Sequence, residues 1–575
     1  MSTPEQHGQR KAKPRIVVIG GVAAGPKAAS RLIRLNPDAE VTIIEKGSLL
    51  SYAGCGLPYY VSGVVKEQKE LMSTPAGVVR DPVFFSKVKN VHVRNATVAL
   101  RIDREKKRVG VAPVGGAEPT EWLAYDKLLL CTGARPVKPP LPGVDKTGVY
   151  TLHEVEDAEG IKTALSETRA KDVVIVGGGL IGVEMTEALA GHGCRVTVVE
   201  KLDQILPMLD AHMARLVEKH MESKGVRVMT GAGVEAILGR ADDDLRVGTV
   251  RTSVGTLPAD MVILSIGVRP NTDLAQDAGL TICGRTRAIA VNGHMQTSDP
   301  DIYAAGDCVA VNHRMTGQPA FLPLGSTANK QGRVAANHIC GIADAFPGVL
   351  GSAVCKVFDF CVARTGLTER EARAAGYDTE VTLTPAPDQA HFMPGARLLV
   401  LKLVADRATR RLLGAQAVGP GAGDKRIDVA AMALTAGMTV DQLAHADLCY
   451  APPFSPAVDN ILTAADVMRN KLDGLFTGVS AGTLQAELDS APPPVLLDVR
   501  TPDEFKSMRL PGSLSIPLGA LRSRLHEVPR DRPVVAFCKI SLRGYEAARI
   551  LKAAGYTDVR VLDGGLATWP YDLEK

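Results

Sequence analysis

The stretch KDVVIVGGGLIGVEMTEALAGHGCRVTVVEK, residues 171–201, sets an apolar strand, a glycine turn, a helix and a second apolar strand in order. The turn reads Gly177-x-Gly179-x-x-Gly182, and the second strand ends on Glu200. Small residues in such a turn let the backbone approach a pyrophosphate at the helix N-terminus, and an acid about 20 residues further on can hold a ribose diol. The stretch therefore predicts a Rossmann-type βαβ unit that binds a dinucleotide.

An earlier stretch repeats this unit. PRIVVIGGVAAGPKAASRLIRL, residues 14–35, reads as a strand, a glycine turn and an alanine-rich helix, and the strand that follows ends on Glu45. The turn GGVAAG is a loosened version of the pattern, in which Ala24 stands where a glycine is often found. The candidate contacts with a nucleotide in this unit are Gly20, Gly21, Ala24, Gly25 and Glu45.

Two dinucleotide sites in one chain allow one nucleotide to pass electrons to the other. Glu200 should accept a hydrogen bond from a free ribose 2′-OH and repel a 2′-phosphate, which favours NADH over NADPH. Lys201 lies beside this acid, so NADPH stays possible.

Two further motifs complete a family pattern. LLLCTGARP, residues 128–136, and DIYAAGDCV, residues 301–309, each read as a strand that runs into a turn. With the two glycine turns they make the first 470 or so residues resemble the FAD-dependent pyridine-nucleotide disulfide oxidoreductases. The resemblance implies FAD on the first unit, contacted by Thr132, Gly133 and Asp307, and a nicotinamide nucleotide on the second. It also implies an interface domain that completes the partner's active site across a homodimer.

A single cysteine occupies the place where disulfide-reducing flavoenzymes usually hold two. SYAGCGLPYY, residues 51–60, sets Cys55 between two glycines, and Pro58 suits the first turn of a helix. A thiol just before a helix N-terminus should ionise more readily, which suits a nucleophile or a partner to flavin. Cys55 is therefore the candidate catalytic thiol. Its resting partner must come from solution or from a sulfur oxidation state.

The single-cysteine branch of the family offers two such partners. One is a sulfenate, as in NADH oxidases and peroxidases, and the other is a mixed disulfide with coenzyme A, as in coenzyme A-disulfide reductases and NADH-dependent persulfide reductases. Peroxidases of the branch carry a histidine in the first glycine turn, and GGVAAG has none. Residues 51–60 and the segment YAPPFSP, residues 450–456, match the coenzyme A branch instead.

That resemblance assigns roles to three more residues. It implies that Tyr450 reaches across the dimer as a proton donor or thiolate stabiliser, that Arg34 meets the phosphates of coenzyme A, and that Ser51 belongs to the substrate site. The branch also has a second tyrosine in a YYPGA-like segment. This chain reads HFMPGA there, so Phe392 and Met393 replace hydroxyl groups.

The composition changes after residue 478, where a further unit begins. It contains DVRTPDEF, residues 498–505, and an apolar strand that runs into Cys538, a six-residue loop and a helix. This order sets the sulfur in a ring of backbone N–H groups that can hold an anion. The unit resembles a single rhodanese domain, and its loop is one residue shorter than in rhodanese-like phosphatases. The resemblance implies that Cys538 carries a persulfide and that Arg543 stabilises it.

The expected fold class is α/β, with two Rossmann-like nucleotide-binding domains, an α+β dimerisation domain and a C-terminal α/β rhodanese domain. The expected boundaries are 14–150 for the first part of the FAD-binding domain, 151–257 for the NAD(P)H-binding domain, 258–331 for the second part of the FAD-binding domain, 332–471 for the dimerisation domain, 472–478 for a linker and 479–575 for the rhodanese domain.

Composition excludes several other classes. The 575 residues carry a formal net charge of only +4, and the basic run RIDREKKR, residues 101–108, holds its own acids, so we expect a solvated hairpin or strand edge and no nucleic-acid partner. The start of the chain is polar and no apolar run is long enough for a membrane span. Ten cysteines without framework or metal-ligand spacing predict the reducing cytoplasm, no disulfide scaffold and no metal.

These features together predict an NADH-dependent flavoprotein. It would reduce coenzyme A persulfide, coenzyme A disulfide or polysulfide through Cys55, release sulfide or thiol, and carry sulfane sulfur on its rhodanese domain. Two alternatives stay open from the sequence: an NADH oxidase or peroxidase that uses a cysteine sulfenate, and a persulfide sensor or carrier.

Overall fold

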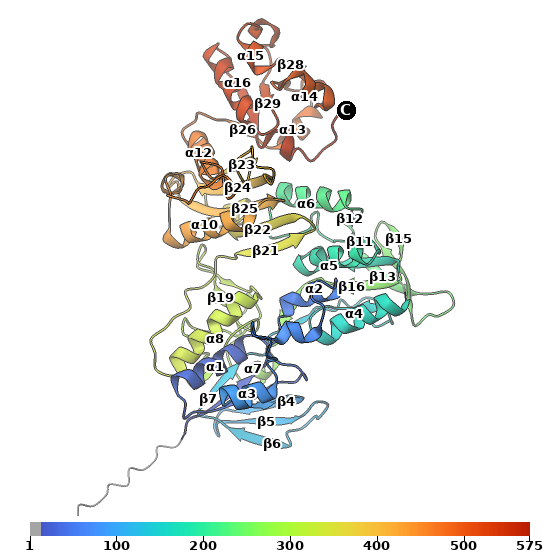
Figure 1. Cartoon of the computed structure of the whole chain (residues 1–575), viewed down its shortest axis with the longest axis vertical. Coiled ribbons are helices and arrows are strands. Elements are labelled where there is room, and N and C mark those ends of the chain that lie inside the picture. Colours follow the sequence, from blue (N-terminus) through green and yellow to red (C-terminus); the bar gives the residue numbers. More distant parts are fainter. Residues whose placement is uncertain (1–12, 169) are drawn as a thin grey trace, which may run out of the picture.

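The computed structural model describes residues 13–168 and 170–575. Figure 1 shows the first nucleotide unit, in blue, and the C-terminal domain, in red, at opposite ends of the molecule, with the interface domain between them. Within the described part of the chain, no helix is long and apolar enough to cross a membrane. Most of the polar N-terminal stretch falls on residues 1–12, outside the described residues.

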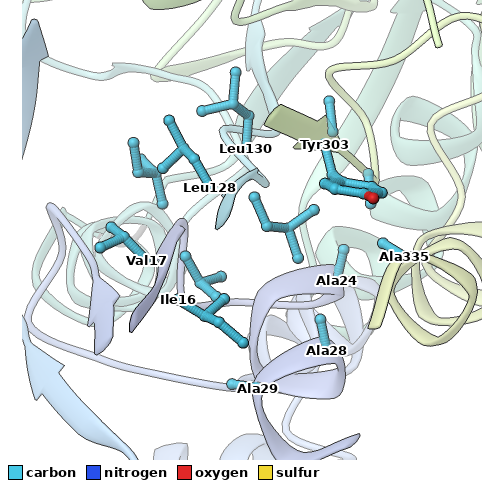
Figure 2. Close-up of a cluster of buried hydrophobic side chains, with 14 of the residues drawn as sticks. Ile16, Val17, Ala24, Ala28, Ala29, Leu128, Leu130, Tyr303 and Ala335 are labelled. Carbon is cyan, nitrogen blue, oxygen red and sulfur yellow. The ribbon is translucent and has the colours of Figure 1, made fainter. Parts of the chain in front are cut away.

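A five-stranded parallel sheet in the order β18-β7-β1-β2-β3 forms the first nucleotide unit. Strands β1, β2, β7 and β18 are mainly apolar and buried, as expected where both faces of a parallel sheet are covered, whereas the edge strand β3 is more exposed. Figure 2 shows part of this core, which includes Ile16, Val17, Ala24, Ala28, Ala29, Leu128, Leu130, Tyr303 and Ala335. The elements are β1 Arg15–Ile19, β2 Glu40–Ile44, β3 His92–Arg94, β7 Lys127–Leu130, β18 Ile302–Ala304, α1 Ala24–Leu35 and α8 Gly325–Ile339.

Small side chains on α1 let it pack closely against α8. A Cβ added at Gly332 of α8 would lie 2.4 Å from the carbonyl oxygen of Ala24, so the two backbones almost touch. This contact fixes the start of α1, where the glycine turn lies, against the helix that follows β18. The shorter elements of the unit are η1 Gly54–Gly56, α2 Leu57–Val61, η2 Gln68–Met72, α3 Pro82–Lys89, α7 Asp273–Asp277, β8 Ala134–Pro136, β17 Val268–Pro270, β19 Val311–Asn312 and β20 Pro319–Ala320.

An antiparallel three-stranded sheet extends from this unit, with β4 Thr97–Asp103, β5 Arg108–Pro113 and β6 Glu121–Ala124. The charged run at residues 101–108 forms the hairpin between β4 and β5, with Asp103 paired to Arg108. The expected hairpin is confirmed.

The second nucleotide unit has a parallel sheet in the order β12-β11-β10-β16-β9. Its elements are β9 Val149–Tyr150, α4 Val155–Thr168, β10 Asp172–Val176, α5 Leu180–Gly191, β11 Arg195–Val199, α6 Ala211–Ser223, β12 Arg227–Met229, β13 Val234–Gly239, β14 Val247–Thr252, β15 Gly255–Pro258 and β16 Met261–Leu264. Because β16 pairs with β10 and with β9, the pairing moves both expected limits of this unit, 151 and 257, outward. The chain leaves the sheet only after β16.

The interface domain is an antiparallel sheet in the order β21-β22-β25-β24-β23. Helices α10 and α12 cover one face, and α5 and α6 of the second nucleotide unit contact strands β21 and β25. β24 and β25 are therefore buried almost along their whole length. The elements are β21 Ala353–Val357, β22 Phe360–Gly366, α9 Glu369–Ala374, β23 Thr379–Pro387, β24 Leu398–Asp406, β25 Leu412–Gly419, α10 Gly423–Ala436, α11 Val440–Ala444 and α12 Asn460–Leu472.

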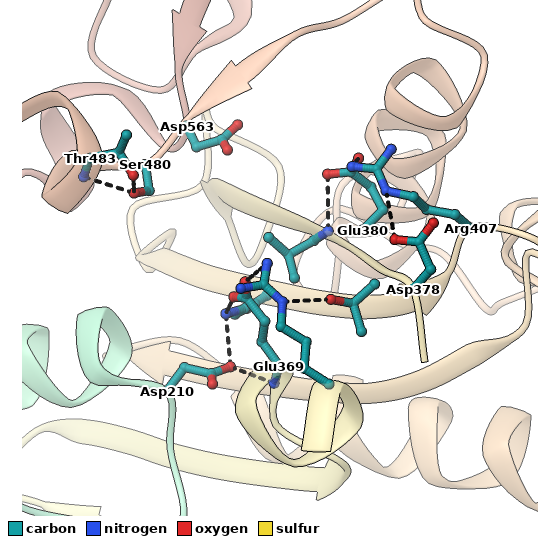
Figure 3. Close-up of polar contacts among 12 residues, drawn as sticks. Asp210, Glu369, Asp378, Glu380, Arg407, Ser480, Thr483 and Asp563 are labelled. Atoms are coloured by element: carbon teal, nitrogen blue, oxygen red, sulfur yellow. Dashed lines mark hydrogen bonds and ion pairs between the residues drawn. The ribbon is translucent and has the colours of Figure 1, made fainter. Parts of the chain in front are cut away.

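Buried charges tie the interface domain to its neighbours (Figure 3). Lys402 of β24 is fully buried, and its Nζ lies 2.8 Å from Asp210 Oδ2 and 2.6 Å from Glu369 Oε2. Asp210 directly precedes α6 in the second nucleotide unit, so this ion pair joins two domains. A buried lysine needs such partners because an unpaired charge in the interior is strongly destabilising.

The C-terminal domain is a parallel sheet in the order β26-β30-β29-β27-β28. Its elements are β26 Gly478–Val479, α13 Ala481–Leu488, β27 Val495–Asp498, α14 Pro502–Ser507, β28 Leu514–Ser515, α15 Leu518–Leu521, η3 Leu525–Glu527, β29 Val534–Phe537, α16 Leu542–Ala553, β30 Val559–Leu562 and η4 Gly565–Thr568. The expected linker, 472–478, is shortened at both ends because Leu472 still belongs to α12 and Gly478 begins β26.

Candidate functional site

The two glycine turns have the same local geometry. Gly20 and Gly177 have φ of +111° and +105°, a region that L side chains rarely adopt. A Cβ at Gly20 would lie 2.0 Å from the carbonyl oxygen of Cys131, and one at Gly177 would lie 2.5 Å from that of Ser265. In both units the turn therefore packs against the residue that follows a neighbouring strand of the sheet, β7 or β16, and only glycine fits there.

The last glycine of each turn packs the helix onto the turn. A Cβ at Gly25 would lie 1.9 Å from the carbonyl oxygen of Gly20, and one at Gly182 would lie 2.1 Å from that of Gly177. This equivalence sets Val22 in register with Gly179. Ala24, which we expected at a glycine position, is in register with Ile181 instead, because the two turns align at both ends without a gap.

The acids that follow the turns are held in the same way. Glu45 accepts from the backbone N–H groups of Gly21 at 2.6 Å and Gly47 at 2.7 Å. Glu200 accepts from Gly178 at 2.7 Å and Leu202 at 2.8 Å. Each carboxylate is thus fixed beside its glycine turn, where a ribose would follow a bound pyrophosphate.

One cavity of about 2340 Å³ runs between the two nucleotide units. Pockets for a single drug-sized ligand are about 300–1,000 Å³, so this cavity has room for more than one nucleotide. The expected residues that line it are Gly20, Gly21, Ala24, Arg34, Glu45, Ser51, Cys55, Thr132, Gly133, Gly177, Gly179, Glu200 and Asp307. Gly25 and Gly182 lie directly behind the turns. The other predicted site residues, Tyr450, Cys538 and Arg543, do not line this cavity.

Cys55 lies on the wall of this cavity and is exposed. It is the middle residue of η1, which leads directly into α2, so the thiol precedes a helix as the sequence suggests. A Cβ at Gly54 would meet nothing within 4 Å, so open space lies beside the sulfur. Ser51 donates its backbone N–H to the carbonyl of Gly21 at 2.8 Å, which ties the cysteine segment to the first glycine turn.

Asp307 follows β18 by three residues and lines the same cavity as the first glycine turn. Burial raises its pKa to about 6, and no described residue donates a hydrogen bond to its side chain. Asp307 is only partly buried and lines the cavity, so its carboxylate can accept from a ligand hydroxyl. The glycine turn, the tied acid and Asp307 together form a donor and acceptor set that fits FAD.

Glu184 is a cavity residue that the sequence motifs do not single out. It lies on α5, one helical turn after Leu180, and lines the cavity between the two units. Burial raises its pKa to about 7. Glu184 and Cys55 line the same cavity. The only sequence feature that could have indicated a role for Glu184 is its charge within the otherwise apolar run LIGVEM.

Replacing Glu184 by glutamine should change stability in a pH-dependent way. Its pKa of about 7 in the folded protein exceeds the usual 4.5 of the unfolded chain, so native stability falls as pH rises through that window. Glu184→Gln should therefore raise the free energy of unfolding at pH 8 by on the order of 2 kcal/mol more than at pH 5, after allowance for partial exposure, and the thermal midpoint should rise with it. Thermal unfolding without NADH at both pH values measures this, and equal shifts would contradict it.

Arg34 lies in the last turn of α1 and also lines the cavity. Lys27, Arg80 and Lys89 line the same cavity, as does Lys46, which is paired with Glu154, so five cations of the first nucleotide unit border it. Such a group suits phosphates beyond those of a dinucleotide at the glycine turn.

Tyr450 does not reach the cavity of its own chain. Its side chain is 51% exposed on the interface domain, where Phe392 and Phe454 are also exposed. The segments that carry them are neighbours, because Ala390 donates its backbone N–H to the carbonyl of Pro452. The structure thus places Tyr450 close to Phe392, the residue that replaces a tyrosine of the coenzyme A branch, on one exposed apolar region. The role of Tyr450 across a dimer stays a prediction.

Cys538 lies at the end of β29 and is fully buried beneath its loop. Ser541, at the start of α16, adopts φ of +75°, which bends the loop around the sulfur. Arg543 interacts with Cys538 and with Glu504, and both interactions raise the pKa of the guanidinium. The expected pair of Cys538 and Arg543 is thus brought together.

Glu504 is a further residue of this site to which the sequence alone assigns no role. Both of its oxygens accept from Arg543, at 2.7 and 2.8 Å, and this ion pair lowers the pKa of Glu504 to about 2. Glu504 also completes the capping box of α14 with Thr501. The T-x-x-E spacing in DVRTPDEF signals the cap, whereas the arginine contact joins residues that are distant in sequence.

Comparisons with known proteins divide the chain in the same way. Family models match residues 14–332 as pyridine nucleotide-disulphide oxidoreductase, residues 352–461 as its dimerisation domain and residues 480–571 as a rhodanese-like domain. The NAD(P)H sulfur oxidoreductase (CoA-dependent) of Pyrococcus abyssi is 38% identical over 460 residues, which cover 80% of this chain and 99% of the relative.

Two solved structures match nearly the whole chain. An NAD-dependent persulfide reductase from A. fulgidus has a TM-score of 0.91 at 45% identity and covers 96% of this chain and 100% of its own. The reduced CoADR-RHD protein of Bacillus anthracis has a TM-score of 0.90 at 37% identity and covers 98% of each chain. The chain therefore belongs to the pyridine nucleotide-disulphide oxidoreductase family and carries a C-terminal rhodanese-like domain.

Proposed function

We propose that this protein is an NADH-dependent flavoprotein that reduces coenzyme A persulfide, coenzyme A disulfide or polysulfide at Cys55. The observation that carries the proposal is that one exposed thiol lines the same cavity as both glycine turns. The names of the relatives, a CoA-dependent sulfur oxidoreductase and a persulfide reductase, support this substrate class.

The family implies FAD and NAD(P)H as cofactors. We assign FAD to the first unit, where Gly20, Glu45 and Asp307 fit it, and the nicotinamide nucleotide to the second unit, at Gly177 and Glu200. When bound, these groups would supply the electron pair that regenerates the thiolate. Glu184, between the two units, is suited to hold or release a proton near neutral pH because burial raises its pKa to about 7.

The thiolate of Cys55 is the nucleophile. With coenzyme A persulfide, attack on the inner sulfur forms a Cys55–coenzyme A disulfide and expels hydrosulfide, whereas attack on the outer sulfur forms a Cys55 persulfide and expels the coenzyme A thiolate. Either adduct needs two electrons and one proton to return the Cys55 thiolate. The sum is one persulfide, one NADH and one proton converted into one thiol, one hydrogen sulfide and NAD⁺, where the added proton converts the hydrosulfide into hydrogen sulfide. Tyr450 of the partner subunit would assist the departing thiolate.

The cations of the first nucleotide unit that border the cavity suit the phosphates of coenzyme A. Arg34 leads this group, with Lys27, Lys46, Arg80 and Lys89 lining the same cavity, and Ser51 is close to the thiol in sequence. The dimerisation domain and its exposed apolar segment around Tyr450 support a homodimer. In the rhodanese domain, Cys538 would carry sulfane sulfur as a persulfide, with Arg543 oriented by Glu504 as its cationic partner.

Anaerobic oxidation of NADH with coenzyme A persulfide as acceptor tests this function. The expected result is one sulfide released per NADH consumed. No sulfide release, together with rapid NADH loss in oxygen or peroxide, would replace the proposal by an oxidase or peroxidase that cycles through a Cys55 sulfenate. No turnover with any of these acceptors would favour a persulfide sensor or carrier.

The nucleotide preference should follow Glu200. Glu200→Gln removes the charge that repels a 2′-phosphate and weakens the acceptor for a free 2′-OH, so the ratio of kcat/KM for NADH over NADPH should fall by about 10- to 100-fold. Steady-state rates with both nucleotides measure it. Glu222→Gln, a change of the same kind at the exposed end of α6, should leave the ratio unchanged. An unaltered ratio in the Glu200 variant would mean that this acid does not discriminate between a free ribose 2′-OH and a 2′-phosphate.

A further inference from the structure

A buried ion pair joins the rhodanese domain to the interface domain. Lys471, at the end of α12, donates from Nζ to Asp563 Oδ2 at 2.8 Å and to the carbonyl of Val381 at 2.8 Å. Its side chain is only 4% exposed, and Glu380 Oε1 lies 3.7 Å away. Figure 3 shows Asp563 of the rhodanese domain above the strand that carries Glu380.

The pair is closed off from solvent by the chain that enters the rhodanese domain. A Cβ at Gly478 would lie 2.4 Å from Asp563 Oδ1 and 2.6 Å from Lys471 Nζ, so the backbone of this residue packs directly against the ion pair and a side chain there would displace it. The ring of Phe476 lies 5.2 Å from the same ammonium group. Burial raises the pKa of Asp563, and Lys471 opposes that effect. Loss of the lysine would leave a carboxylate buried without its cation.

Asp563 begins the segment that holds the loop of the rhodanese cysteine. Leu566 donates its backbone N–H to the carbonyl of Cys538 at 3.0 Å, and Ala567 donates to that of Lys539 at 2.9 Å. Ser541 Oγ donates to the carbonyl of Leu562, the residue before Asp563, at 2.8 Å. The segment packs so tightly that a Cβ at Gly565 would lie 2.4 Å from the Cys538 carbonyl oxygen.

We propose that Lys471 of the interface domain is a positioning residue for the rhodanese site: it anchors Asp563 and thereby sets residues 562–567 against the Cys538 loop. This inference rests on the proposed role of Cys538 as a sulfane sulfur carrier. It makes the rhodanese rate depend on a residue of another domain that touches neither the sulfur nor its substrate. A displacement of reacting groups by about 1 Å can cost 10²-fold in rate.

Sulfur transfer from thiosulfate to cyanide by the full-length chain tests the proposal. The Cys538 thiolate takes the outer sulfur of thiosulfate and expels sulfite, and cyanide then removes that sulfur as thiocyanate and restores the thiolate. In Lys471→Met, kcat should fall by about 10-fold or more, by the same positioning argument, with KM for thiosulfate nearly unchanged. NADH-dependent reduction at Cys55 should keep its native rate.

Two companion variants separate positioning from general loss of stability. Lys471→Met combined with Asp563→Asn removes the unpaired charge and should recover part of kcat, since the neutral amide no longer forces the segment to move. Lys552→Met removes a lysine at the same junction that donates to Thr477 Oγ1 at 3.2 Å, not to Asp563, and should leave kcat unchanged.

The outcomes distinguish this inference from the function on which it rests. An active native chain with an unaltered kcat in Lys471→Met would overturn the positioning role and leave the sulfur carrier standing. Equal losses in the single and double variants, matched by a lower thermal midpoint, would also overturn it in favour of plain destabilisation. A native chain that forms no persulfide on Cys538 would remove the carrier and this inference together.

Discussion

Cys55→Ser should abolish the release of sulfide from coenzyme A persulfide, lowering kcat/KM by on the order of 10³-fold or more, because a serine hydroxyl at neutral pH is a far weaker nucleophile than a thiolate. The side chain lies exposed on the cavity wall, so the substitution removes no buried packing. The variant should therefore fold, retain its flavin spectrum and still be reduced by NADH. Anaerobic stopped-flow spectra and sulfide assays, performed on the same preparation, measure the two half-reactions separately.

A second cysteine provides the matched control for this experiment. Cys283 is also a free thiol that is not fully buried, but it lies outside the cavity, so Cys283→Ser should keep the native rate. Sulfide release that survives in Cys55→Ser would show that the reduction runs through another thiol or directly from the flavin. Loss of the flavin itself from this variant would instead assign Cys55 to the cofactor site.

Cys538→Ser should eliminate formation of a protein persulfide in the rhodanese domain and reduce thiosulfate-to-cyanide transfer to the background rate. The sulfur is the only atom of that loop able to form a sulfur–sulfur bond, and Arg543, locked by Glu504, has no other group to stabilise. Mass spectrometry of the peptide that contains residue 538 after exposure to thiosulfate detects the added sulfur directly. Rates with coenzyme A persulfide and NADH should stay native, since the cavity is untouched.

The converse variant makes this prediction decisive. Cys55→Ser, assayed for thiosulfate-to-cyanide transfer, should be fully active, so the two serine variants would lose opposite activities. If Cys538→Ser also lost the NADH-dependent reaction with free coenzyme A persulfide, the two sites would form one obligatory path. The first nucleotide unit, which carries Cys55, and the C-terminal domain, which carries Cys538, lie on opposite sides of the interface domain (Figure 1), which favours independent activities.

Local motifs predict most of the fold from the sequence. A glycine turn, its strand and its terminal acid lie within about 30 residues of each other, as a βαβ unit does, so the pattern alone pairs Gly177 with Glu200. The limits of the second nucleotide unit are harder to predict from the sequence. β9 and β16 join its sheet from segments separated by more than a hundred residues, and nothing in their short apolar sequences states which sheet they enter.

The site residues that the sequence motifs do not reveal act through contacts between distant segments. Glu504 meets Arg543, and Lys471 meets Asp563, across domain or loop boundaries that spacing does not encode. Glu184 is hard to recognise because a charged residue on a helix is most often solvated. Tyr450 illustrates a different limit, since a side chain that works on a neighbouring subunit has no partner within its own chain.

Glu45 and Glu200 each lose their side-chain freedom on folding, because two backbone N–H groups already hold each carboxylate. That ordering costs up to about 2 kcal/mol for a long polar side chain, and it is complete before a nucleotide arrives. A ribose with a free hydroxyl thus meets a preorganised acceptor, whereas a phosphorylated ribose meets a charge that cannot rotate away. Grafting such a glutamate into another protein without its glycine turn would transfer little of this discrimination.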